Sequence, residues 1–313
     1  MIHTLTIILN WNNPLDTILV ANEVLRHHNS SVVIVDNNSS DSSLNEIQTT
    51  LKKDFLDVAW NKETEFAIVE KKNKPEIFLV SMHENFGFAK AINKVISKVS
   101  KGVFEYVWLL NNDAIPHTKA LAALEKEMDG DKNLGFAGSV IVDFKERNKI
   151  QCCGVKYYPY LGISKLVLKN LNLNLLDAYK INNERIDFQH GSSLLVRLSF
   201  IDQIGLMDER FFLYFEEQDW QIRAEKLGFS NKLVSSSIVY HKGSMSTEHS
   251  KHLFFFYYNT SAMIYCLKHN NLIQILSSFL CLVLITFKRT KMHTKSLAWG
   301  IKGIFNGIKK FHS

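Results

Sequence analysis

Short apolar runs that end in polar residues recur along the N-terminal third of the chain. Residues 5–9, 32–35, 77–80 and 106–110 are such runs, and each is typical of a strand buried on both faces. Apolar residues at helical spacing lie between them, beginning near Pro14 and again over residues 88–99. Buried strands that alternate with helices predict an α/β fold with a mixed, mostly parallel sheet flanked by helices.

Polar side chains follow these runs at the points where the strands are expected to end. They are Asn10-Trp11-Asn12, Asp36-Asn37-Asn38, Asn85 and Asn111-Asn112-Asp113. The carboxyl ends of parallel strands lie at one edge of a sheet, and ligands bind beyond that edge. The pattern therefore predicts that these segments meet at one site.

The second half of the chain is less regular. We expect strands at residues 189–197 and 238–240, and a helix over residues 216–227 that Gly228 is placed to end. Residues 52–74 are charged and poorly periodic, which favours a loop or an insertion. Residues 142–187 match no regular pattern.

Charge divides the chain into two parts. Its 313 residues suffice for one large α/β domain with an appendage or for two modest domains, and a hydrophobic content of 46% excludes disorder. No Asp or Glu follows Glu248, whereas the last 65 residues contain nine Lys and Arg. We therefore predict a body over residues 1–248, which would hold any catalytic site, and a basic helical tail over residues 249–313 that contacts an anionic surface.

The tail also has apolar segments. Residues 272–287 are apolar but short for a transmembrane helix, which needs about 20 residues. Apolar residues then repeat at helical spacing, at Leu297, Ile301, Ile304, Ile308 and Phe311. This pattern favours an amphipathic helix lying on anionic lipid, and docking onto the body is the alternative. Basic charge also suits nucleic acid, but no nucleic-acid-binding motif supports that partner.

Cysteine usage and the N-terminus indicate a cytosolic protein. The four cysteines lack metal-binding spacing, and the neighbours Cys152 and Cys153 would make a strained disulfide. Reduced thiols are the simpler interpretation. No basic segment with a cleavage site precedes the first strand, so we expect no secretory signal.

Two residues are candidates for binding a metal ion. Asp113 follows an apolar strand, and a carboxylate there can bind Mg²⁺ or Mn²⁺, which would neutralise a diphosphate. His241 ends a predicted strand and could complete the site with a neutral imidazole. The alternatives are a turn-forming Asp and an unrelated histidine.

Two further segments suit a nucleotide. Asp36 can accept a base N–H while Asn38 satisfies nearby backbone groups; an Asx turn is the alternative. Asn85 and Gly87 precede a helix whose N-terminus could face phosphates or a sugar, and a simple turn is the alternative there.

An acidic cluster opens the predicted helix at residue 216. Glu216, Glu217 and Asp219 stand at its first turn, where acids also complement the helix dipole. The preceding residues 211–215 are aromatic or apolar. A carboxyl group beside such a wall is expected to have a raised pKa, which suits a general base.

Taken together and in order, these segments resemble family 2 glycosyltransferases of the GT-A (Rossmann-like) fold, especially bacterial rhamnosyltransferase-like members. The resemblance covers residues 5–245, and residues 205–219 are its most specific part. The matching segments are Leu9-Asn10-Trp11-Asn12, Val35-Asp36-Asn37-Asn38-Ser39, Glu84-Asn85-Phe86-Gly87-Phe88-Ala89, Leu109-Leu110-Asn111-Asn112-Asp113, Ile204 to Asp219, and Val239-Tyr240-His241-Lys242.

The resemblance implies a role for each motif. Asp36 would read the base, with Asn10, Asn12 and Asn38 beside the nucleoside. Asn85 and Gly87 would line the nucleotide-sugar pocket. Asn111 and Asn112 begin the DXD-like element, whose last residue Asp113 would bind the metal together with His241. Glu217 would be the catalytic base, flanked by Glu216 and Asp219.

The resemblance also implies an activity: inverting transfer of a sugar from a nucleotide-sugar donor, with Mg²⁺ or Mn²⁺ as cofactor. The resemblance favours dTDP-rhamnose as the donor and a polyprenyl-diphosphate-linked glycan as the acceptor. The product would belong to O-antigen or surface polysaccharide synthesis. The enzyme would lie peripherally on the cytoplasmic face of the inner membrane. Alternatives are a UDP-hexose or UDP-galactofuranose donor, a sugar nucleotidyltransferase, or an inactive glycan-assembly scaffold.

Overall fold

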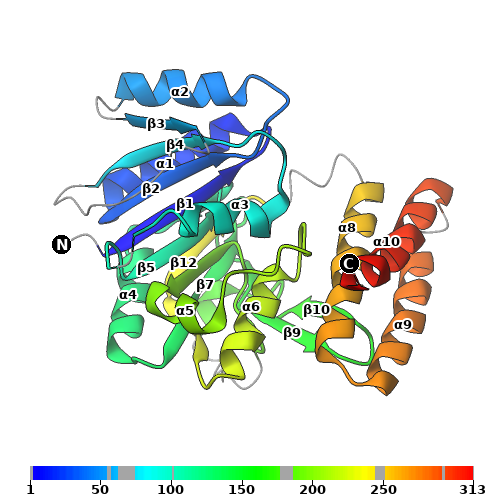
Figure 1. The fold of residues 1–313 in the computed structure, drawn as a ribbon. Helices are drawn as coiled ribbons and strands as arrows, with labels where there is room; N and C mark the ends of the chain where they lie inside the picture. Colours follow the sequence, from blue (N-terminus) through cyan, green and yellow to red (C-terminus); the bar gives the residue numbers. More distant parts are fainter. Residues whose placement is uncertain are drawn as a thin grey trace.

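The computed structural model describes residues 3–54, 58–62, 75–100, 102–176, 186–243, 251–290 and 293–312. A ten-stranded sheet forms its centre, in the order β3-β4-β2-β1-β5-β11-β7-β12-β6 with β8 beside β7 (Figure 1). These strands are β1 (Thr4–Asn10), β2 (Ser30–Asp36), β3 (Val58–Lys62), β4 (Ile77–Ser81), β5 (Tyr106–Asn111), β6 (Ala114–Pro116), β7 (Leu134–Asp143), β8 (Ile150–Cys152), β11 (Ser193–Arg197) and β12 (Ser230–His241).

The sheet is mixed and mostly parallel, as predicted. β3, β4, β2, β1 and β5 run parallel, and β12 runs parallel to β7. β11 runs antiparallel to both of its neighbours, β5 and β7. Its first residue Ser193 therefore pairs with Leu110, near the end of β5. This brings the loop before β11 to the edge where the parallel strands end.

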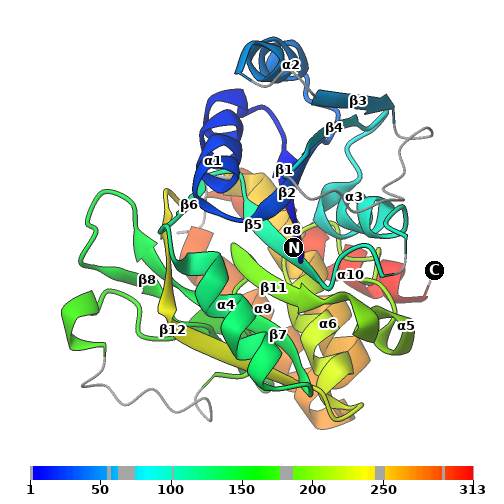
Figure 2. The same cartoon turned by 90° about the vertical axis from the view of Figure 1, so that its left-hand side faces the viewer.

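Helices cover both faces of the sheet (Figure 2). Residues of α1 (Pro14–His27), α2 (Ser43–Asp54) and α4 (Ala120–Gly130) pack against one face. Residues of α3 (Gly87–Ile96), α5 (Ile201–Ile204) and α6 (Glu216–Glu225) pack against the other. β1 serves both layers because successive side chains alternate, so Ile7 joins one cluster and Ile8 the other.

Two regions that lacked a clear sequence pattern contain short strands. β3 lies within the segment expected to be a loop, and residues 55–57 and 63–74 of that segment are outside the described residues. The segment 142–187 contains β8, a small antiparallel sheet of β9 (Val155–Tyr158) and β10 (Ile163–Leu166), and a 3₁₀ turn η1 (Leu173–Leu175). Strands of three to five residues are too short to give a clear periodic pattern.

The C-terminal helices form a separate bundle beside β9 and β10 (Figure 1). They are α8 (Lys251–His269), α9 (Leu272–Thr290) and α10 (Thr294–His312). Asn259 of α8 donates hydrogen bonds to Thr286 Oγ1 of α9 at 2.8 Å and to the Gly300 carbonyl of α10 at 3.0 Å. A side chain at Gly303 would overlap the Phe256 backbone, so glycine lets α10 pack directly on α8.

Our prediction that the apolar residues of this last helix contact lipid is wrong. Ile304 is fully buried, and Ile301, Ile308 and Phe311 pack in the same cluster as residues of α8. This helix packs on α8, which belongs to the tail itself, and its end contacts the body through Arg210, which donates to the Phe311 carbonyl at 3.2 Å. Within the described part of the tail, the exposed large apolar residues lie instead on α9 and at one position of α10. They are Leu272, Ile273, Leu276, Leu280, Leu284, Phe287 and Phe305. By length and composition α9 could cross a membrane, and 17% of its most apolar 18-residue stretch is buried in the protein.

Candidate active site

The ends of the central parallel strands bring the predicted polar segments together. Asn10 at the end of β1 is paired with Asp36 at the end of β2, and Leu9 is paired with Asn111 of β5. Asn10 Nδ2 donates to Asp36 Oδ1 at 2.8 Å. The sheet edge therefore joins three of the predicted segments, as the strand pattern required.

Asp36 is held by neighbouring donors. Its carboxylate accepts the Ser39 hydroxyl on Oδ1 at 2.6 Å and the Ser39 backbone N–H on Oδ2 at 3.2 Å. Asp36 is 2% exposed. The local turn that we considered as an alternative is thus formed, and it fixes the direction of the carboxylate.

Two asparagines shape the loops beside Asp36. Asn12 and Asn38 both have left-handed backbone conformations, with φ of 54° and 58°. Asparagine tolerates this region better than most residues. Asn12 donates its N–H to Ser39 Oγ at 3.0 Å and accepts the Ser40 N–H on Oδ1 at 2.8 Å. These bonds clamp the loop after β1 onto the loop after β2.

The structure gives a reason for glycine at position 87 that the sequence alone did not reveal. Asn85 Oδ1 accepts the Gly87 N–H and the Asn37 side-chain amide, both at 3.0 Å. Gly87 has φ of +74°, and a Cβ there would overlap the Phe212 carbonyl oxygen. Phe88 N–H donates to the same oxygen at 2.8 Å. The close approach that glycine permits is therefore to Phe212.

Asp113 and His241 contact each other. Asp113 Oδ1 lies 3.1 Å from His241 Nε2, and each residue is 7% exposed. On the other side of the ring, His241 Nδ1 lies 2.6 Å from Gln151 Oε1. Asn111 Nδ2 is 3.4 Å from His241 Nε2, whereas Asn112 points to Thr17 Oγ1 at 3.0 Å.

This pair fits a divalent cation. With the Nδ1 proton donated to Gln151, Nε2 and the Asp113 carboxylate present lone pairs to the same space. An imidazole–carboxylate pair suits Mn²⁺ better than Mg²⁺, which prefers oxygen ligands. Among the described residues no group of three or more His, Cys, Asp or Glu could hold a metal ion. The remaining ligands would have to come from a diphosphate and water.

Glu217 lies against the loop that precedes β11. A Cβ on Gly191 would be 3.3 Å from its carboxyl carbon, and the Gly191 backbone hydrogen-bonds to its carboxylate. Its Oε2 has no hydrogen-bond partner among the described residues. Burial raises the pKa of Glu217 to about 7. Burial, followed by the charge of Glu217, raises the pKa of Glu216 well above its ordinary value.

The chain turns sharply into the helix that carries these acids. Tyr214 and Phe215 have φ of 70° and 68°, a conformation that is strained for aromatic residues. Ser261 of α8 holds the turn by donating its hydroxyl to the Leu213 carbonyl at 2.8 Å. The Phe215 ring packs 5.4 Å from the rings of Tyr258 and Tyr265. The C-terminal bundle thus supports the turn before Glu216.

Asp219 belongs to an ion-pair cluster, and its placement corrects its grouping with the catalytic acids. It is fully buried, and its carboxylate lies 2.7 Å from Lys268 Nζ, 2.8 Å from His269 Nε2 and 2.9 Å from Arg223 Nε. Burial opposes ionisation, but hydrogen bonds from His269 and Lys268 outweigh it and lower the pKa of Asp219. Such a carboxylate links α6 to α8 and is a poor proton acceptor.

His190 is a neighbour of the site that the sequence did not single out. Its ring centroid lies 6.5 Å from that of His241, and Gly191 beside it contacts Glu217. Burial and the nearby His241 lower the pKa of His190 to about 4. The antiparallel direction of β11 puts the residue there, and that direction could not be read from the sequence.

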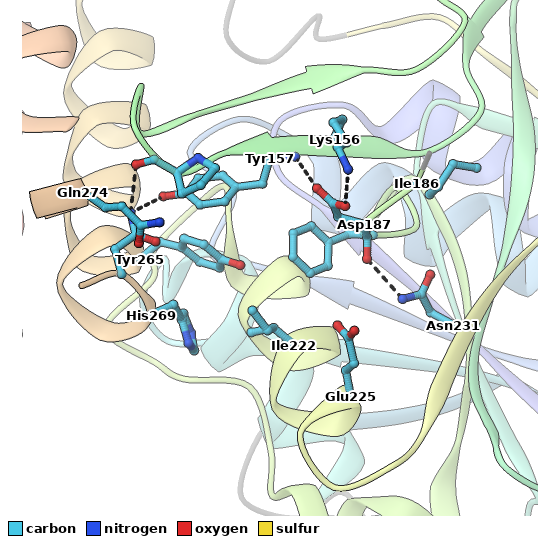
Figure 3. Close-up of a pocket in the computed structure, with 13 residues that line it drawn as sticks. Lys156, Tyr157, Ile186, Asp187, Ile222, Glu225, Asn231, Tyr265, His269 and Gln274 are labelled. Atoms are coloured by element: carbon cyan, nitrogen blue, oxygen red, sulfur yellow. Dashed lines mark hydrogen bonds and ion pairs between the residues drawn. The ribbon is translucent and has the colours of Figure 1, made fainter. Parts of the chain in front are cut away.

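A cavity of about 700 Å³ lies between β9, α6 and the end of α8 (Figure 3). Asp187 in its wall is paired with Lys156 Nζ at 2.9 Å and with the Tyr157 N–H at 2.8 Å. Asn231, near the start of β12, lines the cavity, whereas His241 ends that strand. None of the site residues predicted from sequence lines it.

Residues 7–160 match the family described as Glycosyl transferase family 2. The chain carries a family 2 glycosyltransferase domain. The match covers the segments around Asn10, Asp36, Asn85 and Asp113, and it ends before His190, Glu217 and His241. The domain has the GT-A fold expected from its sequence.

Curated relatives match a short part of this domain. Over 57 residues the chain is 44% identical to the N-acetylglucosaminyl-diphospho-decaprenol L-rhamnosyltransferase of two Mycobacterium tuberculosis strains. The aligned part is 18% of this chain and 19% of each relative. The chain therefore spans about a fifth of the length of the curated relatives it matches.

Solved structures share the fold over nearly the whole chain. A mannosyltransferase from Pyrobaculum calidifontis, solved with GDP-Man and Mn²⁺, has a TM-score of 0.57 at 11% identity and covers 99% of this chain and 87% of its own. GalNAc-T7, solved with UDP, GalNAc and Mn²⁺, has a TM-score of 0.55 at 12% identity, covering 94% and 58%. TarS from S. aureus has a TM-score of 0.53 at 12% identity, covering 99% and 80%.

Proposed function

We propose that this protein is an inverting, metal-dependent glycosyltransferase that uses a nucleotide-diphosphate sugar. The observation that carries the proposal is the position of the loop 190–192, which lies beside the Asp113–His241 pair and beside Glu217. The pair that would bind the cation and a carboxyl group of raised pKa therefore lie beside the same loop. The family match weighs against the sugar nucleotidyltransferase alternative.

On the donor side, residues of the first three strand ends would bind the nucleotide. Asp36, fixed by Asn10 and Ser39, presents a carboxylate to a base N–H. Asp113 and His241 would hold Mn²⁺ or Mg²⁺, which supplies positive charge to a diphosphate leaving group. Asn12 and Asn38 shape the loops around the nucleoside, and Asn85 braces the segment that follows β4.

On the acceptor side, Glu217 would take the proton of the attacking hydroxyl. A base works best when its pKa lies near the working pH, and burial raises the pKa of Glu217 to about 7. The acceptor oxygen would attack the anomeric carbon on the face opposite the leaving diphosphate, which inverts the configuration. Glu217 Oε2, which has no hydrogen-bond partner among the described residues, would accept this proton.

The donor and acceptor that we propose are dTDP-rhamnose and a polyprenyl-diphosphate-linked glycan. The names of the mycobacterial relatives specify an L-rhamnosyl group and a decaprenol-diphosphate acceptor, over a short aligned segment. The basic tail is compatible with a lipid-linked acceptor, and we place the enzyme peripherally on the cytoplasmic face of the membrane. O-antigen or another surface polysaccharide would be the product.

Incubation of purified protein with Mn²⁺, dTDP-rhamnose and a polyprenyl-diphosphate N-acetylglucosamine tests this proposal. We expect a rhamnosylated lipid to form, and NMR should show that its anomeric configuration is inverted relative to the donor. UDP-hexoses and UDP-galactofuranose serve as parallel donors, because transfer from one of these would correct the sugar while preserving the enzyme class. Absence of transfer and of donor hydrolysis with every donor would contradict the proposed activity.

A further inference from the structure

The loop of His190, Gly191 and Ser192 lies between the two groups to which we assign the reaction. On one side, the His190 ring packs edge to face with the ring of His241 at 6.5 Å. On the other, the Gly191 backbone contacts the Glu217 carboxylate. The loop is fixed at its end by the Ser192 carbonyl, which accepts the Asn111 N–H at 3.1 Å. His190 is therefore held at the junction of the two halves of the site.

Hydrogen bonds at one ring nitrogen define which tautomer His190 adopts. The Ser192 backbone N–H donates to His190 Nδ1 at 3.2 Å. Nδ1 is therefore an acceptor without a proton, and the Ser192 hydroxyl at 2.8 Å must also donate to it. The proton of the neutral ring is consequently on Nε2. The loop thus presents an oriented N–H group from a side chain that retains some exposure.

We propose that His190 is a donor-binding residue whose Nε2–H hydrogen-bonds to a β-phosphate oxygen of the nucleoside diphosphate. The inference rests on the proposed function, because the diphosphate is the anionic group expected beside Asp113 and His241. The acids of this region, Asp113, Glu216 and Glu217, supply only acceptors when ionised. An anionic oxygen placed among them needs a neutral or cationic donor, and the fixed Nε2–H is suited to that task.

The test measures binding without turnover, by calorimetry in the presence of Mn²⁺. UDP, dTDP and GDP are compared with the corresponding monophosphates on wild type, His190→Ala and His190→Gln. We expect His190→Ala to weaken binding of the preferred diphosphate about tenfold or more, as for loss of a hydrogen bond to a charged group. Its monophosphate should bind as to wild type. His190→Gln, which keeps a side-chain N–H, should recover part of the loss.

Two controls separate this role from a structural one. His27→Ala removes a surface histidine at the end of α1 and should leave every affinity unchanged. Mn²⁺ binding followed by electron paramagnetic resonance should also be unchanged in His190→Ala. Equal losses for diphosphate and monophosphate would show a damaged site and overturn the proposal, as would full diphosphate affinity in His190→Ala. Failure of wild type to bind any diphosphate would instead overturn the proposed function itself.

Discussion

Asp113 and His241 lie with Oδ1 and Nε2 3.1 Å apart, although one follows β5 and the other ends β12. β6 runs antiparallel to β12 and pairs Ala114 with His241, which sets this contact. Gln151 then orients the imidazole from its far side. The pair is therefore a product of sheet topology, and its chemistry can be tested apart from catalysis.

Asp113→Asn and His241→Ala should each weaken Mn²⁺ binding by about tenfold or more, because each removes one of the two protein ligands. Electron paramagnetic resonance of free Mn²⁺ measures this directly. Gln151→Ala should cause a smaller loss, since it removes only the group that orients the ring. Asp131→Asn, at an exposed turn, is the matched control. Unchanged Mn²⁺ affinity in both ligand variants would remove the metal site from our account.

Glu217→Gln should reduce transfer by about 10²–10⁴-fold while donor binding stays intact, because the amide cannot accept the acceptor's proton. In wild type the base is active when ionised, so kcat should rise with pH through about 7 and then level off. The pH profile of kcat at saturating donor and acceptor is the measurement. A profile that is flat from about pH 5 to 8 would indicate a different base.

The same carboxyl group should reduce folding stability at neutral pH. Its pKa is raised on folding, so its contribution is fully present below about 4.5 and is lost as pH rises toward about 7. Glu217→Gln removes this loss, and we expect it to stabilise the protein by about 1–2 kcal/mol at pH 8, allowing for partial exposure. Urea unfolding at pH 8 and at pH 4.5 measures the difference, which should shrink at the lower pH. A variant less stable than wild type at both values would be inconsistent with a buried, costly charge.

Asp219→Asn should destabilise the protein by about 3 kcal/mol, since it removes the buried carboxylate that Arg223, Lys268 and His269 share, although Lys268 keeps its ion pair with Asp208. Because these groups link α6 to α8, protease digestion should also release the C-terminal helices more readily. Glu146→Gln breaks an exposed pair with Lys149 and should cost less than about 1 kcal/mol. If both variants unfold at the same urea concentration, Asp219 does not join the helices in the way described.

The sequence predicted the strand-end residues because parallel strands follow one rule: they end at the same edge. Asn10, Asp36 and Asn111 therefore meet as expected. His190 escaped prediction because its place depends on the direction of β11. The different environments of Glu217 and Asp219 also escaped it, because two of the groups that pair with Asp219, Lys268 and His269, come from α8, whose docking leaves no local pattern.

The tail shows the same limit of local pattern. Both α9 and α10 have apolar residues, and periodicity cannot tell which of them packs inside. Gly303 allows α10 to lie directly on α8, and this contact buries its apolar face. The exposed residues of α9 consequently form the surface for which we propose membrane contact.

Leu276→Glu combined with Leu280→Glu on α9 should weaken binding to anionic vesicles by at least about tenfold, because charged groups would replace buried apolar area at the interface. The basic residues Lys288 and Arg289 end the same helix, so binding to vesicles of phosphatidylglycerol should exceed binding to neutral vesicles and fall with salt. Vesicle sedimentation measures both effects. Leu227→Glu changes an equally exposed leucine outside the tail and should leave vesicle binding unchanged. Circular dichroism of the double variant should show that the bundle remains folded, because both leucines are exposed and contribute little to its core. Equal vesicle binding by wild type and the folded double variant would assign membrane contact to another surface.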